Sequence, residues 1–289
     1  MSGEMRMQSV RMEYGDERAR KLVLDDCSFT VARGKLNVLI GPSGCGKTTI
    51  VNLLAGYERP TAGDITLDGE SVRGPGWTRL VVFQETALFP WLSVLDNVLF
   101  GPSVRGSMKR AQARREARRL LEIVGLKDFA DKYPLHLSGG MQRRAELARA
   151  MINDPKVMLM DEPFRGLDAM TRKLMQEHYL RLFEEGGRTN LFVTSELDEA
   201  VFLADRLIIL TNRPTRVKKI VEIDLPRPRE ISVLGSRRFL ELKQEALETL
   251  HEEAVKAFAA GGRSAQDLVE AYGRRVRGRS ASQTERVDS

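Results

Sequence analysis

Apolar residues along the 289-residue chain form two kinds of pattern, and each kind predicts a different element. Short apolar runs bounded by turn residues predict strands, whereas apolar residues at helical spacing predict helices. The expected strands are 5–14, 22–31, 36–40, 64–67, 80–83, 156–161, 189–194 and 206–211. The expected helices in this part of the chain are 48–55, 109–124, 168–183 and 196–203. Because strand and helix alternate from position 156 onwards, we expect a parallel sheet.

Two stretches interrupt this alternation. Residues 60–74 carry turn residues around the short strand 64–67, which predicts a small antiparallel layer. Residues 88–150 contain helical patterns and no convincing strand, which predicts an inserted helical subdomain. The core is expected to end near Leu225, so residues 1–225 form one predicted domain and 226–289 a second region.

The region after Leu225 has three predicted parts. Pro226-Arg227-Pro228-Arg229 predicts an extended linker, because proline disfavours both helices and inner strands. The segment 236–259 is expected to be an amphipathic helix, which could dock on the core, contact a partner subunit or bind a regulator. Its apolar residues at helical spacing are Phe239, Leu242, Ala246, Leu250, Ala254 and Phe258. Beyond Gly273 the composition predicts disorder, and the basic end is expected to be solvated, with anionic lipid contact as the alternative. The basic residues of this tail are Arg274, Arg275, Arg277 and Arg279.

Composition narrows the class of protein. Hydrophobic residues make up 42% and charged residues 30%, as in a soluble globular protein. No apolar run approaches the roughly 20 residues that span a bilayer, and the N-terminus lacks a signal-peptide pattern, so a cytosolic location is expected. The net charge of +6 permits contact with nucleic acid or anionic lipid without requiring either. Cys27 and Cys45 lack metal-ligand spacing, and no disulfide is expected.

A glycine-rich loop stands between the strand 36–40 and the helix that follows it. It reads Gly41-Pro42-Ser43-Gly44-Cys45-Gly46-Lys47-Thr48-Thr49. Its glycines let the backbone N–H groups point inward at phosphate oxygens, and the helix N-terminus adds a favourable dipole. Lys47 is expected to reach the β- and γ-phosphates of a nucleotide, and the Thr48 hydroxyl to bind Mg²⁺. The alternative is a chance glycine-rich turn, which the strand-loop-helix context argues against.

Two acidic residues and an amide follow other predicted strands. Asp161 ends the apolar run 157–160 and is expected to hold Mg²⁺, while Glu162 could act as a general base on the attacking water. The alternative is an acidic turn before Pro163. Gln84 follows the strand 80–83, and its amide could contact both Mg²⁺ and that water. Taken alone, a glutamine in this position is more often a solvated polar residue.

The stretch Ser138-Gly139-Gly140-Met141-Gln142 lies between the phosphate loop and the acidic strand. This order resembles one family, the ATPase subunits of ABC transporters, over roughly residues 5–225. The resemblance implies an α/β fold of the P-loop NTPase type, with a RecA-like core, an antiparallel β subdomain and the helical subdomain at about 88–150. It also implies ATP and Mg²⁺ as cofactors, and an ATPase coupled to transmembrane transport.

The resemblance implies a composite site in a head-to-tail dimer. Each ATP would lie between one subunit's phosphate loop and the other's Ser138, Gly139 and Gly140, and Gln142 matches the family's glutamine. Tyr14 lies where the family places an aromatic residue on adenine, although an ordinary strand tyrosine is the alternative. Gly166-Leu167-Asp168 matches the loop that crosses the dimer interface.

Finer motifs resemble bacterial importers for nitrate, sulfonate, taurine and related small solutes. They include Asp161-Glu162-Pro163-Phe164 and Asp224-Leu225-Pro226-Arg227-Pro228-Arg229. This branch implies permease subunits, a periplasmic solute-binding protein, a second ATPase subunit and a peripheral position on the cytoplasmic side of the inner membrane, with no nucleic-acid partner. The segment 86–92 could contact the permease, with local packing of Phe89 and Trp91 as the alternative.

Three residues depart from the family's pattern. Ser195 stands where the family has a histidine that contacts the γ-phosphate, Arg165 replaces a small residue, and Arg143 stands where a second glutamine is common. Loss of a hydrogen bond to a charged group, about 1.5–3 kcal/mol, would slow hydrolysis roughly 10- to 100-fold. We therefore expect either slow turnover or pairing with a second, unlike ATPase subunit. Harmless drift is the alternative, with a water or Glu196 in the histidine's role.

Two rival functions remain open. A soluble ABC ATPase acting on DNA or the ribosome would usually carry a coiled-coil insertion or two cassettes, and this chain has neither. A regulatory nucleotide-binding subunit with little catalysis stays possible because of Ser195. The solute cannot be named, since ATPase subunits do not form the substrate pocket.

Overall fold

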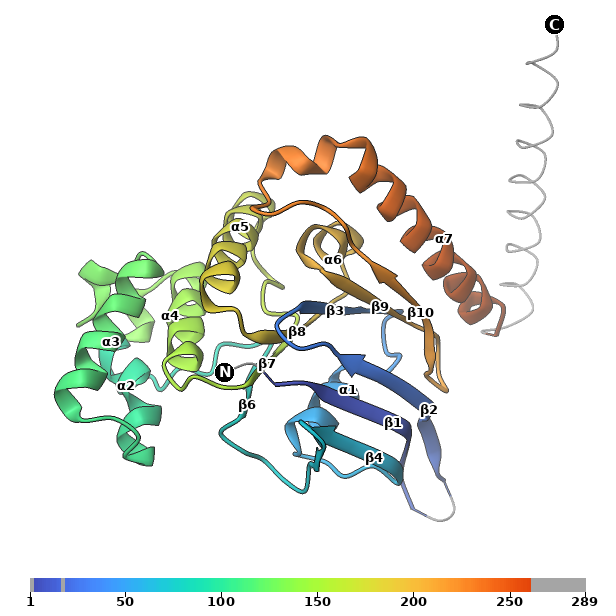
Figure 1. The fold of residues 1–289 in the computed structure, drawn as a ribbon, viewed down its shortest axis with the longest axis horizontal. Coiled ribbons are helices and arrows are strands. Elements are labelled where there is room, and N and C mark those ends of the chain that lie inside the picture. Colours follow the sequence, from blue (N-terminus) through green and yellow to red (C-terminus); the bar gives the residue numbers. More distant parts are fainter. Residues whose placement is uncertain (1–2, 17–18, 261–289) are drawn as a thin grey trace, which may run out of the picture.

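The computed structural model describes residues 3–16 and 19–260, with side chains up to residue 256. Two sheets lie one above the other, and a group of helices projects from one end of them (Figure 1). The basic tail residues and the Phe258 side chain lie outside what the structure describes. No described helix is long and apolar enough to cross a membrane.

The larger sheet has six strands, and its parallel core confirms the prediction from strand-helix alternation. Its order is β10-β9-β3-β8-β7-β6, with every neighbouring pair parallel except β10 and β9. The strands are β3 (Leu36–Ile40), β6 (Arg79–Val82), β7 (Val157–Asp161), β8 (Thr189–Thr194), β9 (Arg206–Leu210) and β10 (Val217–Glu222). Every residue of β3, β7 and β8 is buried, which explains their nearly unbroken apolar runs.

Successive residues of β3 face two different cores. Leu39 packs with α1 (Lys47–Ala55) and the smaller sheet, whereas Val38 and Ile40 pack with the helices on the opposite face. Those helices are α5 (Ala169–Gly186) and α6 (Leu197–Leu203). The parallel sheet is therefore covered on both faces, and α1 is enclosed between the two sheets (Figure 1).

The smaller sheet is antiparallel and contains β1 (Met5–Tyr14), β2 (Lys21–Val31), β4 (Ala62–Leu67) and β5 (Glu70–Ser71), in the order β2-β1-β4-β5. Buried and exposed residues alternate over much of β1, as expected for a sheet with one face in the core. The predicted antiparallel layer is therefore present, and the first two strands belong to it.

The inserted helical subdomain contains α2 (Val94–Arg105), α3 (Arg110–Ile123) and α4 (Gly139–Met151). Two short 3₁₀ turns, Lys127–Phe129 and Pro134–His136, connect α3 to α4. Ser93 caps α2 by accepting the Asp96 N–H at 3.1 Å, and Ser138 caps α4. These helices form the end that projects away from the sheets (Figure 1).

The segment predicted as a linker is held against the core. Arg229 is 4% exposed, and its Nη1 donates to the carbonyls of Phe202 at 2.9 Å and Ala204 at 2.7 Å. Arg227 pairs with Asp205 at 2.8 Å. The segment is thus anchored by its two arginines, which the proline pattern alone did not indicate.

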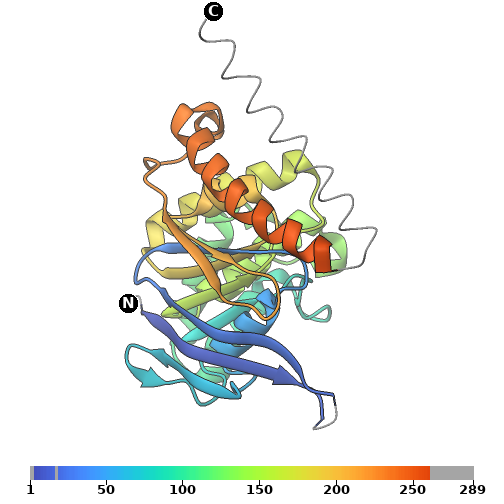
Figure 2. The same ribbon diagram turned by 90° about the vertical axis from the view of Figure 1, so that its right-hand side faces the viewer.

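The C-terminal helix α7 (Arg237–Ala260) docks on the core, packing against α6, β9 and β10 (Figures 1 and 2). Phe239, Leu242 and Ala246 are buried as the apolar spacing predicts. The prediction is wrong at Ala254, which is exposed. Thr249 and Glu253 occupy the buried positions there, so the buried stripe becomes polar towards the end of the helix.

Strand β10 was not predicted from the sequence. It pairs antiparallel with β9 at the sheet edge, and Val221 is its one buried residue. Lys218, Lys219 and Glu222 are exposed along it, so it lacks the apolar pattern of the inner strands.

Candidate functional site

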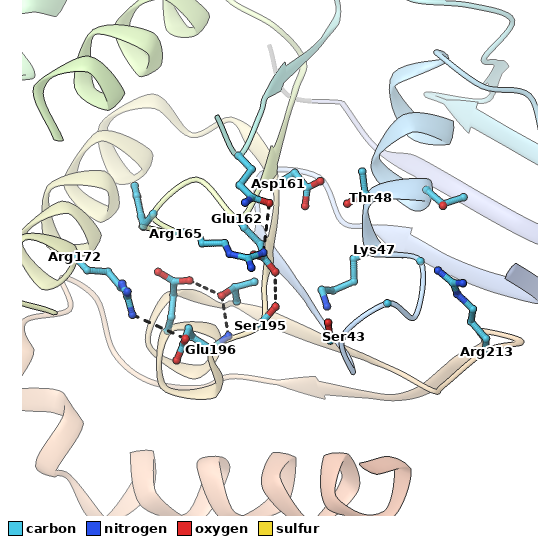
Figure 3. A pocket seen from close by; sticks show the side chains of 17 residues that line it. Ser43, Lys47, Thr48, Asp161, Glu162, Arg165, Arg172, Ser195, Glu196 and Arg213 are labelled. Carbon is cyan, nitrogen blue, oxygen red and sulfur yellow. Dashed lines mark hydrogen bonds and ion pairs between the residues drawn. The ribbon is translucent and has the colours of Figure 1, made fainter. Parts of the chain in front are cut away.

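A pocket of about 450 Å³ opens at the carboxyl ends of β3, β7 and β8 (Figure 3). It brings together most of the residues that the sequence nominated. The nominated residues that line it are Ser43, Gly44, Gly46, Lys47, Thr48, Thr49, Gln84, Asp161, Glu162 and Ser195. Gly41, Pro42 and Cys45 belong to the same loop but do not line the pocket. Glu196, which the sequence offered as an alternative in the histidine's role, also lines the pocket. The sequence did not indicate three other lining residues that carry charge: Arg172, Glu199 and Arg213.

Two glycines of the loop are required by its geometry. Gly46 has a φ of 112°, and a Cβ there would lie 2.8 Å from the Val23 side chain. A Cβ on Gly41 would lie 2.9 Å from Leu210 Cβ. Gly46 is also the N-cap of α1 and supplies no side-chain cap, so the first N–H groups of the helix remain available to an anion.

Lys47 and Cys45 are both buried in this loop. The Lys47 ammonium donates to the carbonyls of Gly41 at 2.9 Å and Pro42 at 3.2 Å, so it is folded over the loop and faces the pocket. Burial raises the pKa of the Cys45 thiol and raises that of Cys27 to about 12. Both cysteines are free, so neither forms a disulfide.

Asp161 and Thr48 face each other across the pocket floor. Burial raises the pKa of Asp161, and a hydrogen bond with the Thr48 side chain opposes that shift. A buried carboxylate beside a hydroxyl suits Mg²⁺, which prefers oxygen ligands and completes its shell with phosphate and water. Among the described residues no group of three or more His, Cys, Asp or Glu side chains could hold a metal, so the ion would depend on those additional oxygens.

Glu162 is held in an uncommon conformation next to Asp161. Its φ is 46°, which non-glycine residues rarely adopt, and its N–H donates to the Val193 carbonyl at 2.9 Å. The Ser195 hydroxyl donates to one carboxylate oxygen of Glu162, and Arg165 Nη1 lies 2.9 Å from the other. Arg165 also lies 3.5 Å from the Gln84 amide oxygen, so Gln84 belongs to the same cluster as Glu162 and Ser195. Figure 3 shows Glu162, Arg165 and Ser195 side by side.

Glu196 and Glu199 line the same side of the pocket in different states. Glu196 is exposed and pairs with Arg172 at 4.0 Å. Glu199 is buried and accepts hydrogen bonds from the side chains of Thr194 and Gln176. Burial raises the pKa of Glu199, which those hydrogen bonds oppose. Glu196 therefore has a partner of its own and no contact with Glu162 among the described interactions.

Tyr14 lies beside the phosphate-loop helix and outside the lining of the pocket. Its hydroxyl contacts Glu58 and lies 3.4 Å from Thr49 Oγ1, and the residue is 39% exposed. Its ring is therefore accessible at the edge of the site, and stacking on adenine stays a prediction.

Ser138, Gly139 and Gly140 lie apart from the phosphate loop. Ser138 and Gly140 line a second pocket, and among the described residues the two pockets share no lining residue. Ser138 Oγ accepts the Met141 N–H at 3.4 Å, a weak cap that leaves the hydroxyl largely exposed. Gln142 instead braces the preceding turn, because its Nε2 donates to the carbonyls of Pro134 and Leu137 at 3.0 and 3.2 Å.

Arg143 has a structural use that the sequence did not indicate. It is 4% exposed, pairs with the buried Glu146, and donates to the Phe83 carbonyl at 2.7 Å and to the Gln84 carbonyl. Glu146 accepts the Ala87 N–H at 3.2 Å. This buried pair fastens α4 to the segment that carries Gln84, so removing either partner would leave an uncompensated charge.

A phosphate loop, an acidic strand end and a helical insertion on a doubly covered parallel sheet define the class of P-loop nucleotide-binding proteins. Comparison with known sequences narrows this class. The sequence profile described as ABC transporter matches residues 24–165. An uncharacterized ABC transporter ATP-binding protein of Methanocaldococcus jannaschii, MJ0412, is 44% identical over 245 residues, covering 85% of this chain and 90% of that protein.

Two further relatives are taurine import ATP-binding proteins named TauB. The protein from Roseobacter denitrificans is 47% identical, covering 68% of this chain and 73% of that protein. The protein from Jannaschia sp. is 44% identical, covering 78% and 85%. A solved dimeric structure of MJ0796, a bacterial ABC transporter cassette, has a TM-score of 0.67 and 28% identity, covering 77% of this chain and all of that one. This chain belongs to the family of ABC transporter ATP-binding proteins.

Proposed function

We propose that this chain is the ATP-binding subunit of an importer for a small anionic or zwitterionic solute of the taurine, sulfonate or nitrate type. Two subunits close around ATP, and closure drives the permease through its transport cycle. The observation that carries the proposal is the division of the predicted site. Lys47, Asp161 and Glu162 share one pocket, whereas Ser138 lines another. The taurine import relatives support the solute class.

In the closed dimer, Lys47 would leave the loop carbonyls and bind the phosphates of ATP. Thr48 and Asp161 would hold Mg²⁺, which neutralises phosphate charge when it is bound. Glu162 would accept a proton from the attacking water, and Gln84 would orient that water. Ser138 of the other subunit would donate to the γ-phosphate, aided by the N-terminus of α4.

An apolar groove supports a permease partner. Trp77, Phe89 and Phe100 line a pocket of about 370 Å³ between β6 and the helical subdomain. Phe89 packs on Phe100 at 4.6 Å between ring centroids, and the neighbouring Trp91 is 71% exposed. Such an exposed aromatic surface would accept a cytoplasmic helix of the permease. Phe89 also contacts the Trp91 ring, with 5.5 Å between the ring centroids. Phe89 is thus used in local packing, and the largely exposed Trp91 would still offer ring surface to a partner.

A catalytically weak subunit is the second candidate, and one observation favours it. The groups around Glu162 are the neutral hydroxyl of Ser195 and the guanidinium of Arg165, which pairs directly with the proposed base. In this arrangement both carboxylate oxygens of Glu162 already have a partner, which would have to give way before the attacking water could bind there. The subunit would then turn over slowly or pair with an unlike ATPase subunit.

The deciding experiment is a pull-down of the tagged subunit from gently solubilised native membranes, with each co-purifying chain identified. A permease with this subunit as its one ATPase supports a homodimer. A second ATPase subunit with a histidine at the position of Ser195 supports the asymmetric pair. Recovery of ribosomes or DNA without any membrane protein would overturn the transport proposal.

A further inference from the structure

The loop between β9 and β10, residues 211–216, connects the nucleotide pocket to the C-terminal helix α7. Arg213 of this loop lines the pocket. It lies at the opposite end from Arg172 and Glu196, beyond Lys47 (Figure 3). Asp161 and Glu162 mark the end at which the γ-phosphate would lie, so Arg213 stands towards the nucleoside end.

The loop is fastened to the phosphate loop on one side. Thr215 is fully buried, and its hydroxyl donates to the Cys45 carbonyl. The Thr215 N–H donates to the Val23 carbonyl at 2.8 Å, and its own carbonyl accepts the Asp25 N–H at 3.1 Å. Any displacement of the 211–216 loop would therefore disturb the backbone that surrounds the phosphates.

The same loop is fastened to α7 on its other side. Glu253 is 3% exposed, and its carboxylate accepts the Asn212 N–H at 3.2 Å, while the Asn212 amide donates to the Glu253 carbonyl. Lys256 and Lys218 lie 2.9 and 3.4 Å from the Glu253 carboxylate. Burial acts to raise the pKa of Glu253, but these contacts outweigh it and hold the pKa below its ordinary value. Glu253 is therefore a charged anchor for the residue before Arg213.

The Arg213 guanidinium has no partner that would occupy it. Among the described residues no carboxylate lies within ion-pair distance of it, although the neighbouring Arg216 pairs with Asp25. Burial raises the pKa of the Tyr14 hydroxyl and of the Cys45 thiol, and the charge of Arg213 opposes the shift in both. Arg213 is thus near both the aromatic ring expected to face adenine and the phosphate loop.

We propose that Arg213 binds the nucleoside monophosphate part of ATP and ADP, and that Glu253 of α7 positions it there. The inference rests on the proposed function, since it assigns two further residues to the same site. A planar guanidinium suits both a phosphate oxygen and the face of a purine. The C-terminal helix then contributes to nucleotide affinity, although none of its side chains up to residue 256 lines the nucleotide pocket.

The test is calorimetric binding of Mg-ADP and Mg-ATP to the purified full-length chain. Arg213→Ala is expected to weaken both nucleotides by a similar factor, roughly tenfold or more, because the contact is to the part that they share. Arg213→Lys keeps the charge without the planar fork and is expected to give an intermediate loss. Unchanged ADP affinity in Arg213→Ala would overturn the proposal.

The positioning role has its own readout. Glu253→Ala is expected to weaken ADP binding roughly threefold to tenfold, and to add little in the Arg213→Ala background, because its effect passes through Arg213. Glu253→Gln keeps an acceptor for the Asn212 N–H but loses the charge that Lys218 and Lys256 contact, and it is expected to recover part of the affinity. Glu252→Ala is the matched control, since Glu252 pairs with Lys218 at 3.1 Å from the exposed side of α7 and should leave affinity unchanged.

Failure of the proposed function can be distinguished from failure of the positioning role of α7. A wild-type chain that binds neither nucleotide would overturn the proposed function, and this inference with it. A wild-type chain that binds both while the losses from Arg213→Ala and Glu253→Ala simply add would leave the proposed function intact. That result would overturn the positioning role of α7 alone.

Discussion

The phosphate loop and the Ser138 motif are two parts of one predicted site, yet they are built in opposite ways. The phosphate loop is fastened from several directions, with Lys47 donating to the Gly41 carbonyl at 2.9 Å, and Thr215 donating to the Cys45 carbonyl. Ser138 lies at an exposed helix start, and the one hydrogen bond that the structure shows for its side chain is weak, at 3.4 Å.

In the proposed dimer, this difference would divide the two steps between subunits. A preorganised loop can bind phosphate without further ordering, so one chain would suffice for nucleotide binding. The exposed serine and helix N-terminus would bind phosphate only when another chain brings it. Binding should therefore depend on the phosphate loop, and hydrolysis on both parts.

The largest effect should come from Glu162→Gln, which removes the proposed base and keeps its size. Hydrolysis is expected to fall roughly 10²- to 10⁴-fold, since that is the usual contribution of general base catalysis. ATP binding should persist, so ATP-bound dimers should accumulate in size-exclusion chromatography. Rapid hydrolysis by this variant would assign the base to another group, with Glu196 and Glu199 as the other glutamates that line the pocket.

Lys47→Ala should remove most of the ATP affinity that we assign to the phosphate loop. Loss of two charge-assisted contacts is expected to weaken ATP binding roughly 100- to 1,000-fold. Calorimetry of the purified chain measures this, with the exposed Lys132→Ala as a control of equal charge change. If both variants bind ATP like the wild type, the pocket at β3 and α1 is not the nucleotide site.

Ser195→His tests whether the neutral hydroxyl beside Glu162 limits turnover. If the proposal of a weakened subunit is right, introducing a donor that can carry charge is expected to raise the rate of hydrolysis roughly 10- to 100-fold at unchanged ATP affinity. Steady-state phosphate release measures it, and Ser195→Ala shows what the present hydroxyl contributes through Glu162. A rate no higher than that of the wild type would count strongly against the weakened-subunit proposal.

Ser138→Ala should have the smallest effect on hydrolysis, and it separates the role of Ser138 most clearly from that of the phosphate loop. Hydrolysis by the dimer is expected to fall about tenfold, because one hydroxyl contact to the γ-phosphate is lost. ADP affinity of the dilute, monomeric subunit should not change, since Ser138 does not line the phosphate-loop pocket. An equal loss in ADP binding would mean that the two parts act within one chain.

Much of the fold could be predicted because its inner strands are buried on both faces. The continuous apolar runs in β3, β7 and β8 follow directly from that burial. Strand β10 escaped prediction because an edge strand needs little apolar surface. The buried polar residues near the end of α7 were not predicted for a related reason. Glu253 is buried through hydrogen bonds and ion pairs, which leave no apolar pattern in the sequence.

In the candidate site, too, some residues could be predicted from a sequence pattern and others could not. The phosphate loop is continuous in sequence, so its pattern alone nominates Lys47 and Thr48. Arg213 belongs to a loop more than 160 positions beyond the phosphate loop in the sequence. The contacts of Thr215 and Asn212 hold that loop beside the pocket. Arg165 stood out in the sequence as a departure from the resemblance, but the sequence alone did not indicate that it pairs with Glu162.

The burial of both cysteines makes the chain well suited to thiol labelling. Cys27 and Cys45 are its two thiols, both are buried, and burial raises the pKa of each. Little thiolate forms near neutral pH, so maleimide dyes should react slowly with the unmodified protein. A single cysteine introduced at Leu135, which is 82% exposed and lies just before Ser138, would then carry the fluorophore almost alone. Energy transfer between two such dyes would follow the approach of the subunits in real time.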